Sequence, residues 1–372
     1  MKKQLATILG VALLSTGALA SKARLEALGQ DSYGSFFLDD ARNVTLNPAM
    51  LNFHKDFVTM EWGQTTHRTD DATTPRAEGG MFKAAGNMVY GLYLGDESNT
   101  GNGLRALTGS VHESNNTTLY VAGDAGVQWG VKLTYHDYKD EQNAGGDITS
   151  SAARTTIGMI SGDIEAFLQI GLLNKAENKA TSAEFNGKGS YQLGVTYAMG
   201  DIDYLLEIQT ITAENAASEK FSAQYTRIGA AKQYKLNDKA NVWTSAWYKM
   251  DNTKCEYTGA CAVSDFGSGD QKNAYLPLSI ALEVAAKDWL TLRGSVSQNF
   301  IGTTENDAGD KKTMADTTSV AAGASLLWGD LTIDGMIGNN DNNQTVGTDT
   351  AGGAGTLRTD TLMSRVSMTY KF

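Results

Sequence analysis

The sequence predicts an all-β fold, a transmembrane antiparallel β-barrel of about 16 strands. Three observations lead to it: runs that alternate between apolar and polar residues, short turns that alternate with long polar loops, and an N-terminal export signal. A period of two places one face of each strand on lipid and the other in the lumen. The short turns are expected on the periplasmic side and the long loops on the extracellular side.

Composition agrees with this class. The 372 residues carry 31 Lys+Arg against 42 Asp+Glu, a net charge of −11, and 41% of them are apolar. These values exclude a wholly disordered chain and argue against a nucleic-acid partner, which needs a basic surface. After residue 20 no apolar run approaches the ~18 residues that a membrane helix needs, whereas the strands of a barrel hide their hydrophobicity in alternation.

Residues 1–20 have the parts of a secretory signal peptide. Lys2 and Lys3 precede an apolar run from Leu5 to Leu14, and Ala18-Leu19-Ala20 supplies the small residues of a cleavage site. The mature chain is therefore expected to begin at Ser21.

Residues 21–55 are expected to form a pre-barrel segment that is too short for a domain, followed by the barrel over 56–372. Within the segment, Asp39, Asp40 and Arg42 are expected to form a local ion pair rather than a ligand site.

Seven two-residue turns divide the barrel region into hairpins. Gly, Asn and Asp dominate them because tight hairpins need positive φ. The turns are Gly86-Asn87, Gly123-Asp124, Gly162-Asp163, Gly200-Asp201, Asn237-Asp238, Lys287-Asp288 and Gly329-Asp330. They join fourteen strands, and a first strand near 56–62 and a last strand near 356–372 bring the count to sixteen.

Alternation is clear in most strands, for example from Val127 to Tyr135, but two neighbouring strands depart from it. Between 220 and 236 and between 240 and 250 neither face is cleanly apolar. Two interpretations remain open: a bulge that switches faces, or an oligomer interface in which Arg227 and Trp247 face another subunit.

Sixteen strands generally leave a water-filled lumen, so the charged residues at inward positions are candidates to line a pore. They are Lys132, His136, Glu165, Asp203, Glu207, Glu283, Arg293, Asp334 and Arg365. The loop 96–116, with Glu97, Arg105, His112 and Glu113, is long enough to constrict the lumen, and the loop 251–272 is equally long. Excess acid is expected to favour cations modestly.

Cys255 and Cys261 are the only cysteines and are expected to form a disulfide in a loop of an exported protein. No His lies near them to complete a metal site, and no cofactor is expected. The motifs of metalloproteases, serine hydrolases and P-loop enzymes are absent from the sequence, so the chain is not expected to be an enzyme.

The last strand places Tyr370 and the C-terminal Phe372 on one face. This resembles the terminal signal by which the barrel-assembly machinery recognises Gram-negative outer-membrane proteins, and it implies that machinery as a partner during insertion.

The stretches 23–29, 36–43, 47–49 and 56–62 resemble the porin-like major outer-membrane proteins of predatory bacteria. The resemblance implies an abundant homo-oligomeric barrel, a trimer or a larger ring, in the outer membrane, with lipid held between subunits. Two functions remain open: passive diffusion of small polar solutes, or a non-conducting structural barrel whose oligomer organises or encloses lipid and whose lumen is blocked by loops or by residues 21–55.

Overall fold

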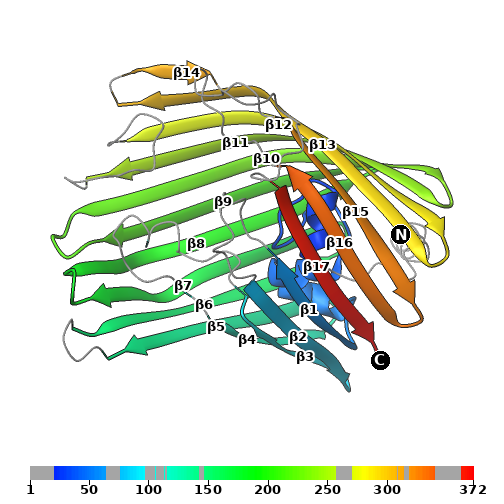
Figure 1. The fold of residues 1–372 in the computed structure, drawn as a ribbon, viewed down its shortest axis with the longest axis horizontal. Coiled ribbons are helices and arrows are strands. Elements are labelled where there is room, and N and C mark those ends of the chain that lie inside the picture. The colour runs from blue at the N-terminus through cyan, green and yellow to red at the C-terminus, as the bar shows by residue number, and fades with distance from the viewer. Residues whose placement is uncertain are drawn as a thin grey trace.

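A computed structural model describes residues 21–63, 76–96, 105, 113, 115–141, 146–256, 270–307, 309–313, 318–339 and 362–372. The strands form one antiparallel sheet, in which β1 pairs with both β2 and β17, so the sheet closes on itself (Figure 1). Sixteen strands make the wall, and the short β14 (Lys311–Thr313) pairs with the end of β13. The predicted sixteen-stranded barrel is confirmed.

The wall strands lengthen on one side of the barrel. They are β1 (Phe57–Gly63), β2 (Arg76–Ala85), β3 (Met88–Leu94), β4 (Thr117–Asp124), β5 (Gln128–Asp140), β6 (Ile148–Ser161), β7 (Ile164–Asn178), β8 (Ala183–Met199), β9 (Ile202–Glu214), β10 (Lys220–Asn237), β11 (Ala240–Cys255), β12 (Gln271–Lys287), β13 (Leu290–Asn306), β15 (Ser319–Trp328), β16 (Leu331–Asn339) and β17 (Leu362–Lys371). Strands β6 to β13 extend far past the short strands β1 to β4 at the end that carries the long loops (Figure 1).

Six of the seven short turns lie at the predicted places, within a residue. Gly162 and Gly200 have φ of 59° and 67°, values that glycine adopts without a steric penalty. The turn predicted at Gly123-Asp124 lies slightly later, because β4 continues to Asp124 and Gly126 supplies the positive φ.

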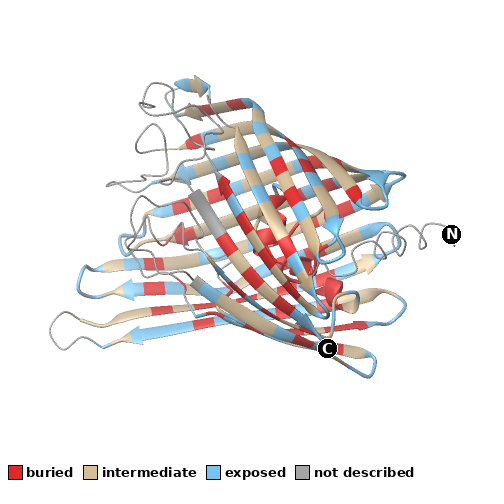
Figure 2. Ribbon diagram, turned by 45° about the vertical axis from the view of Figure 1, so that its right-hand side comes forward, coloured by how far each residue is buried: buried red, intermediate tan, exposed pale blue. Residues whose placement is uncertain are grey.

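Burial alternates along the strands, as the banding in Figure 2 shows. In β5, the outward Val131, Leu133 and Tyr135 are exposed, while Lys132 and Thr134 between them are buried. The apolar side chains therefore form the outer surface, where lipid is expected, and the polar ones point inward.

No bulge switches the faces of β10 between Phe221 and Lys235, and the register shift in its pairing with β11 lies at the turn, between Lys235 and Asn237. The pairing of β10 with β11 continues in register from Phe221 to Lys235. The inward face of these strands carries aromatic side chains because another part of the chain packs against it inside the barrel.

Residues 21–55, here called the lumenal segment, lie within the barrel, toward the short-turn end (Figure 1). The segment contains α2 (Lys22–Ala27) and two 3₁₀ turns, η1 (Ala41–Thr45) and η2 (Pro48–Asn52). Among the described residues, no helix is long and apolar enough to cross a membrane.

Candidate functional site: an occupied lumen

Each short helix of the lumenal segment begins at a residue suited to capping. The Ser21 hydroxyl accepts from the Arg24 amide at 2.9 Å, and the Asp40 carboxylate accepts from the Arg42 amide at 2.8 Å. Asn47 caps η2, and Pro48 follows it at the first position, where its missing N–H costs nothing. Local sequence thus specifies the helices, but pieces this short need tertiary contacts to persist.

Arg42 connects the segment to one side of the wall. Its guanidinium lies 2.8 Å from Glu78 of β2 and 3.5 Å from Glu61 of β1. It also lies 3.3 Å from Asp96 and donates to the Tyr93 hydroxyl at 2.6 Å. The Arg42 side chain is only 2% exposed, so these charges are paired away from bulk water.

A second ion-pair group lies farther round the wall, on β12, β13 and β16. Arg24 pairs with Asp40 at 2.6 Å, inside the segment, and with Glu283 of β12 at 3.0 Å. Arg293 of β13 then joins Glu283, at 2.5 Å, to Asp334 of β16, at 3.1 Å. Two predicted pore-lining acids and one predicted pore-lining base are thereby bound to one another and to the segment.

The expected local ion pair among Asp39, Asp40 and Arg42 is therefore wrong. The Asp40 carboxylate accepts a hydrogen bond from the backbone amide of Arg42, but its ion pair is with Arg24 and not with the Arg42 side chain. Asp39 contacts His54 at 2.8 Å. The Arg42 side chain points instead at the wall, where buried carboxylates need a cation.

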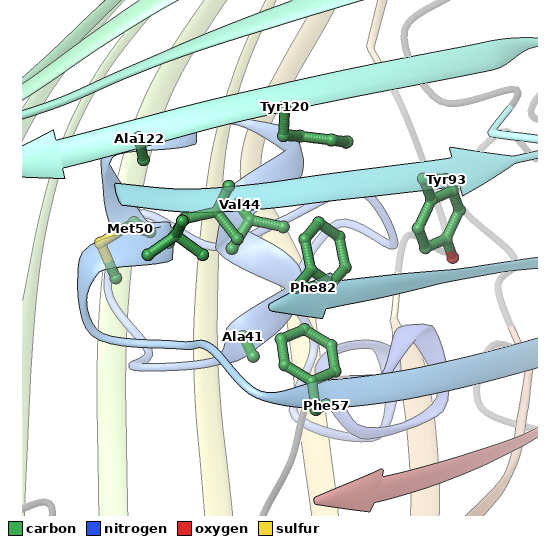
Figure 3. Close-up of a cluster of buried hydrophobic side chains, with 10 residues drawn as sticks. Ala41, Val44, Met50, Phe57, Phe82, Tyr93, Tyr120 and Ala122 are labelled. Atoms are coloured by element: carbon green, nitrogen blue, oxygen red, sulfur yellow. The ribbon is translucent and has the colours of Figure 1, made fainter. Parts of the chain in front are cut away.

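Apolar contacts complete the attachment. Ala41, Val44, Met50 and Leu51 of the segment pack against an apolar patch on the inner faces of β1 to β4 (Figure 3). The wall members of this cluster are Phe57, Phe82, Val89, Tyr93, Tyr120 and Ala122. Leu25, Leu28 and Leu38 form a smaller cluster with Ala281 of β12. These inward apolar residues break the polar-in pattern of a water-filled barrel because the segment, not water, covers them.

Glycines make room for the segment in the wall. A Cβ on Gly130 of β5 would lie 2.3 Å from the Pro48 carbonyl carbon, and one on Gly158 of β6 would lie 1.8 Å from Asn47 Oδ1. On the other side, a Cβ on Gly323 of β15 would lie 2.7 Å from the Ala27 Cβ. The wall therefore carries its smallest residue where the segment approaches most closely.

The predicted pore-lining residues all have inward positions in the structure. Five contact the lumenal segment directly: Lys132 donates to the Thr45 carbonyl, Glu165 accepts from Asn47, and Glu283, Asp334 and Arg365 contact Arg24, Ser21 and Glu26. Arg293 reaches it through Glu283 and Asp334. Asp203 is half-buried, Glu207 contacts Gln192 and Arg227, and His136 contacts Ser150. A role in permeation remains a prediction for each of them.

Two residues of the loop 96–116 lie against the inner wall. Arg105 contacts Ser150 of β6 and Asn174 of β7 and lies over the Phe185 ring of β8. Glu113 pairs with Arg154 at 2.7 Å. Both loop residues are fully buried, and the constriction of the lumen by this loop stays a prediction. Glu97 and His112 lie outside the described residues.

The oligomer-interface prediction for Arg227 and Trp247 is wrong. Arg227 Nη1 lies 3.1 Å from Asp31 and 3.3 Å from Glu207, and the Trp247 ring packs on Phe36 and Phe37, 6.3 and 4.6 Å between centroids. Both side chains point inward and bind the lumenal segment. Their strands lacked a clean polar inner face because this wall is a packing surface.

The remaining predicted features concern the ends of strands. Cys255 ends β11, and Cys261 lies outside the described residues, as do residues 1–20, so the disulfide and the signal peptide stay predictions. Tyr370 is exposed near the end of β17, and Phe372 ends the chain beside Lys83. Their role in insertion also stays a prediction.

Sequence reasoning did not single out Lys22, Glu61 or Glu78. Lys22 Nζ lies 2.6 Å from Glu78, and the Lys22 amide donates to Glu61 at 2.7 Å. Two signals were present: glutamates at inward positions of the first two strands, and arginines in a segment too short to fold alone.

No protein-family model matches the chain, and no curated protein does. Among solved structures, a bacterial polysaccharide outer-membrane secretin is similar, with a TM-score of 0.51, 7% identity, and coverage of 85% of this chain and 97% of that one. A porin matches with a TM-score of 0.43 and 14% identity, over 85% of this chain and 99% of that one. The outer-membrane channel DcaP of Acinetobacter baumannii matches with a TM-score of 0.40 and 11% identity, over 85% and 95%.

A closed antiparallel barrel with an apolar outer surface and a charged interior defines the chain as a Gram-negative outer-membrane β-barrel. Its fold is similar to that of the outer-membrane secretin, the first of these structures. The resemblance to the predatory-bacterial proteins stays a prediction.

Proposed function

We propose that this protein is a porin-like channel for passive diffusion of small polar solutes, and that the lumenal segment limits its conductance. A barrel of sixteen strands encloses a lumen wider than side chains alone can fill. The loop residues Arg105 and Glu113 narrow one part of this lumen, and the lumenal segment occupies another. We assign the chain no catalytic role.

One observation carries the proposal: the segment binds charged residues on opposite sides of the wall. Arg42 reaches β1 and β2, and Arg24 reaches β12. Asp31 reaches Arg227 of β10. Solutes must therefore pass between the segment and the wall, or cross the barrel only when the segment is displaced. In either case the charged side chains that line the lumen act on the solutes at short range.

The test is single-channel recording of the purified full chain in a planar bilayer under a KCl gradient. We expect discrete current steps that are smaller than those of an open barrel of sixteen strands. Silence from protein whose migration on an unheated gel shows a folded barrel would overturn the proposal.

The same contacts favour a second function, a non-conducting structural barrel whose oligomer organises or encloses outer-membrane lipid. In that case the segment is a permanent part of the core, and variants that loosen it also stay silent. If such variants also show no current, the structural barrel is the function supported. If they show current, the protein is a channel that the segment closes.

We further propose that the chain is a homo-oligomer, a trimer or a larger ring, in contact with outer-membrane lipid and inserted by the barrel-assembly machinery. Its outer surface is apolar on every side, with exposed residues such as Leu92, Leu206 and Ile280. Native mass spectrometry in mild detergent gives the subunit number and any retained lipid, and a bare monomer at all detergent concentrations would contradict this.

A further inference from the structure

We infer that the mature N-terminus is itself a structural charge: the α-ammonium of Ser21 binds inside the barrel, between Asp334 and Glu61. Removal of the leader then supplies a cation that helps hold the lumenal segment in place. The inference rests on cleavage after Ala20, and it does not depend on whether the barrel conducts.

The position of Ser21 carries the argument. Its side chain is fully buried, and its hydroxyl donates to Asp334 Oδ2 at 3.0 Å. The next amide in the chain, that of Lys22, donates to Glu61 Oε2 at 2.7 Å. The Ser21 nitrogen therefore lies close to both carboxylates. Asp334 binds the hydroxyl of the same residue, and Glu61 binds the amide of the next residue.

The charges around this nitrogen leave a carboxylate in excess. Arg24 and Arg293 are the two cations of the group that contains Asp40, Glu283 and Asp334, so this group has three acids and two bases. Arg293 faces Asp334 Oδ1, and Oδ2 is turned toward Ser21. A carboxylate that is 1% exposed is costly to leave without a full counter-charge.

Glu61 offers a second acceptor. Its side chain is 3% exposed, and its Oε1 makes no hydrogen bond among the described residues, the nearest cation being Arg42 at 3.5 Å. An ammonium carries three donors, so one nitrogen could satisfy both Asp334 and Glu61. Within the described part of the chain, the other charged groups near this corner are Lys22 of the segment with Glu78 of β2, Arg293 of β13, and the Arg365–Glu26 pair of β17 and α2.

The chemistry is ordinary peptide hydrolysis. A signal peptidase adds one water across the Ala20–Ser21 amide, the C–N bond breaks, Ala20 leaves as a carboxylate, and the new Ser21 amine takes up a proton. Before cleavage the same nitrogen is an uncharged amide with a single N–H. Cleavage thus changes the charge at one buried atom by one unit, next to acids that are already in place.

The test measures the reactivity of that amine in the folded mature protein. Mass spectrometry first identifies the N-terminal residue of protein taken from outer membranes. The folded protein is then treated with an amine-acetylating reagent at a series of pH values, unfolded, and treated again with the isotopically heavy reagent, so that the light-to-heavy ratio at Ser21 reports labelling in the folded state.

Only the neutral amine reacts with the reagent. A carboxylate bound to the ammonium favours the protonated form, so labelling then requires a higher pH. We expect Asp334→Asn and Glu61→Gln each to lower the pH of half-maximal labelling by about one unit, which is about a tenfold faster reaction below the midpoint. Asp251→Asn, which removes an acid that contacts Tyr275 of the wall, is the matched control and leaves the midpoint in place.

If burial alone slowed the labelling of Ser21, the pH of half-maximal labelling would be the same in all three variants. Equal midpoints would therefore overturn the inference. It would also be overturned by folded outer-membrane protein that still carries residues before Ser21. If one acid variant does not fold, the other gives the comparison, because the two acids belong to different strands.

Discussion

At the scale of single residues, Arg42 shows how a buried cation depends on its partners. Three carboxylates, Glu61, Glu78 and Asp96, lie within ion-pair distance of one guanidinium. Removing one member of a buried ion-pair group usually costs more than the group contributes in total, because the remaining charges are left without compensation.

Arg42→Ala is therefore expected to lower the free energy of unfolding by about 3–5 kcal/mol. Urea titration followed by the loss of the fast-migrating folded band measures this change. Lys83→Ala is the control: Lys83 pairs with Asp56 at 3.0 Å but is 53% exposed, so its loss should cost less than about 1 kcal/mol. Equal losses in the two variants would contradict the role of Arg42.

The Asp31 carboxyl is expected to make the stability of the folded chain depend on pH in the acid range. Burial alone would raise the pKa of its carboxyl, but attraction by Arg227 and Lys249 outweighs burial and lowers the pKa below the ordinary value of 3.8. The folded chain thus keeps Asp31 ionised where an unfolded chain protonates it. The stabilisation is complete above the ordinary value and is lost as the pH falls through the lower folded value.

The stability difference between the wild type and Asp31→Asn should consequently be constant from pH 7 to about pH 5 and should vanish in stronger acid. Unfolding titrations at several pH values measure it. Asp238→Asn removes an acid that is 88% exposed and gives the background. A difference that grows on acidification would show that the sign is wrong.

At the scale of elements, the fit between η2 and the glycines of β5 and β6 positions the segment. Strand glycines cost entropy and provide no side chain to pack. Gly130 and Gly158 nevertheless occupy the inner wall where Asn47 and Pro48 touch it. The wall and the segment are thus matched in shape as well as in charge.

Gly158→Ala is expected to displace η2, because its Cβ would lie 1.8 Å from Asn47 Oδ1 and 3.0 Å from Pro48 Cδ. Overpacking of this kind costs about 1–3 kcal/mol, so the conducting fraction should rise by about tenfold for each 1.4 kcal/mol. Single-channel recording measures it. Gly335→Ala is the control, since nothing lies within 4 Å of the added Cβ. Identical currents from both variants would mean that η2 does not limit permeation.

At the scale of the whole molecule, the net charge is −11, and the predicted removal of residues 1–20, which carry two lysines, makes it −13. Acids also outnumber bases in the ion-pair group of Arg24 and Arg293. A negative interior raises the local concentration of cations, and salt screens this effect.

A modest preference for K⁺ over Cl⁻ is therefore expected, from the reversal potential in a KCl gradient. The preference should weaken as both salt concentrations are raised at a fixed ratio. A reversal potential of zero at low salt would contradict the argument.

Sequence by itself determined the barrel. Strand number, turn positions and the outward apolar face depend on a period of two and on turn residues, and both are local properties of the chain. The predicted inward charges followed from the same alternation, and their inward placement required no knowledge of distant contacts.

Only the tertiary structure decided what fills the lumen. Ser21 binds Asp334 across 313 positions of sequence, and Arg227 and Trp247 contact a segment about 200 residues away. No periodicity relates such residues, since their contact depends on closure of the whole sheet. The mixed faces of β10 and β11 looked irregular for this reason: a side chain that points into a lumen can be apolar when another part of the chain, rather than water, lies opposite it.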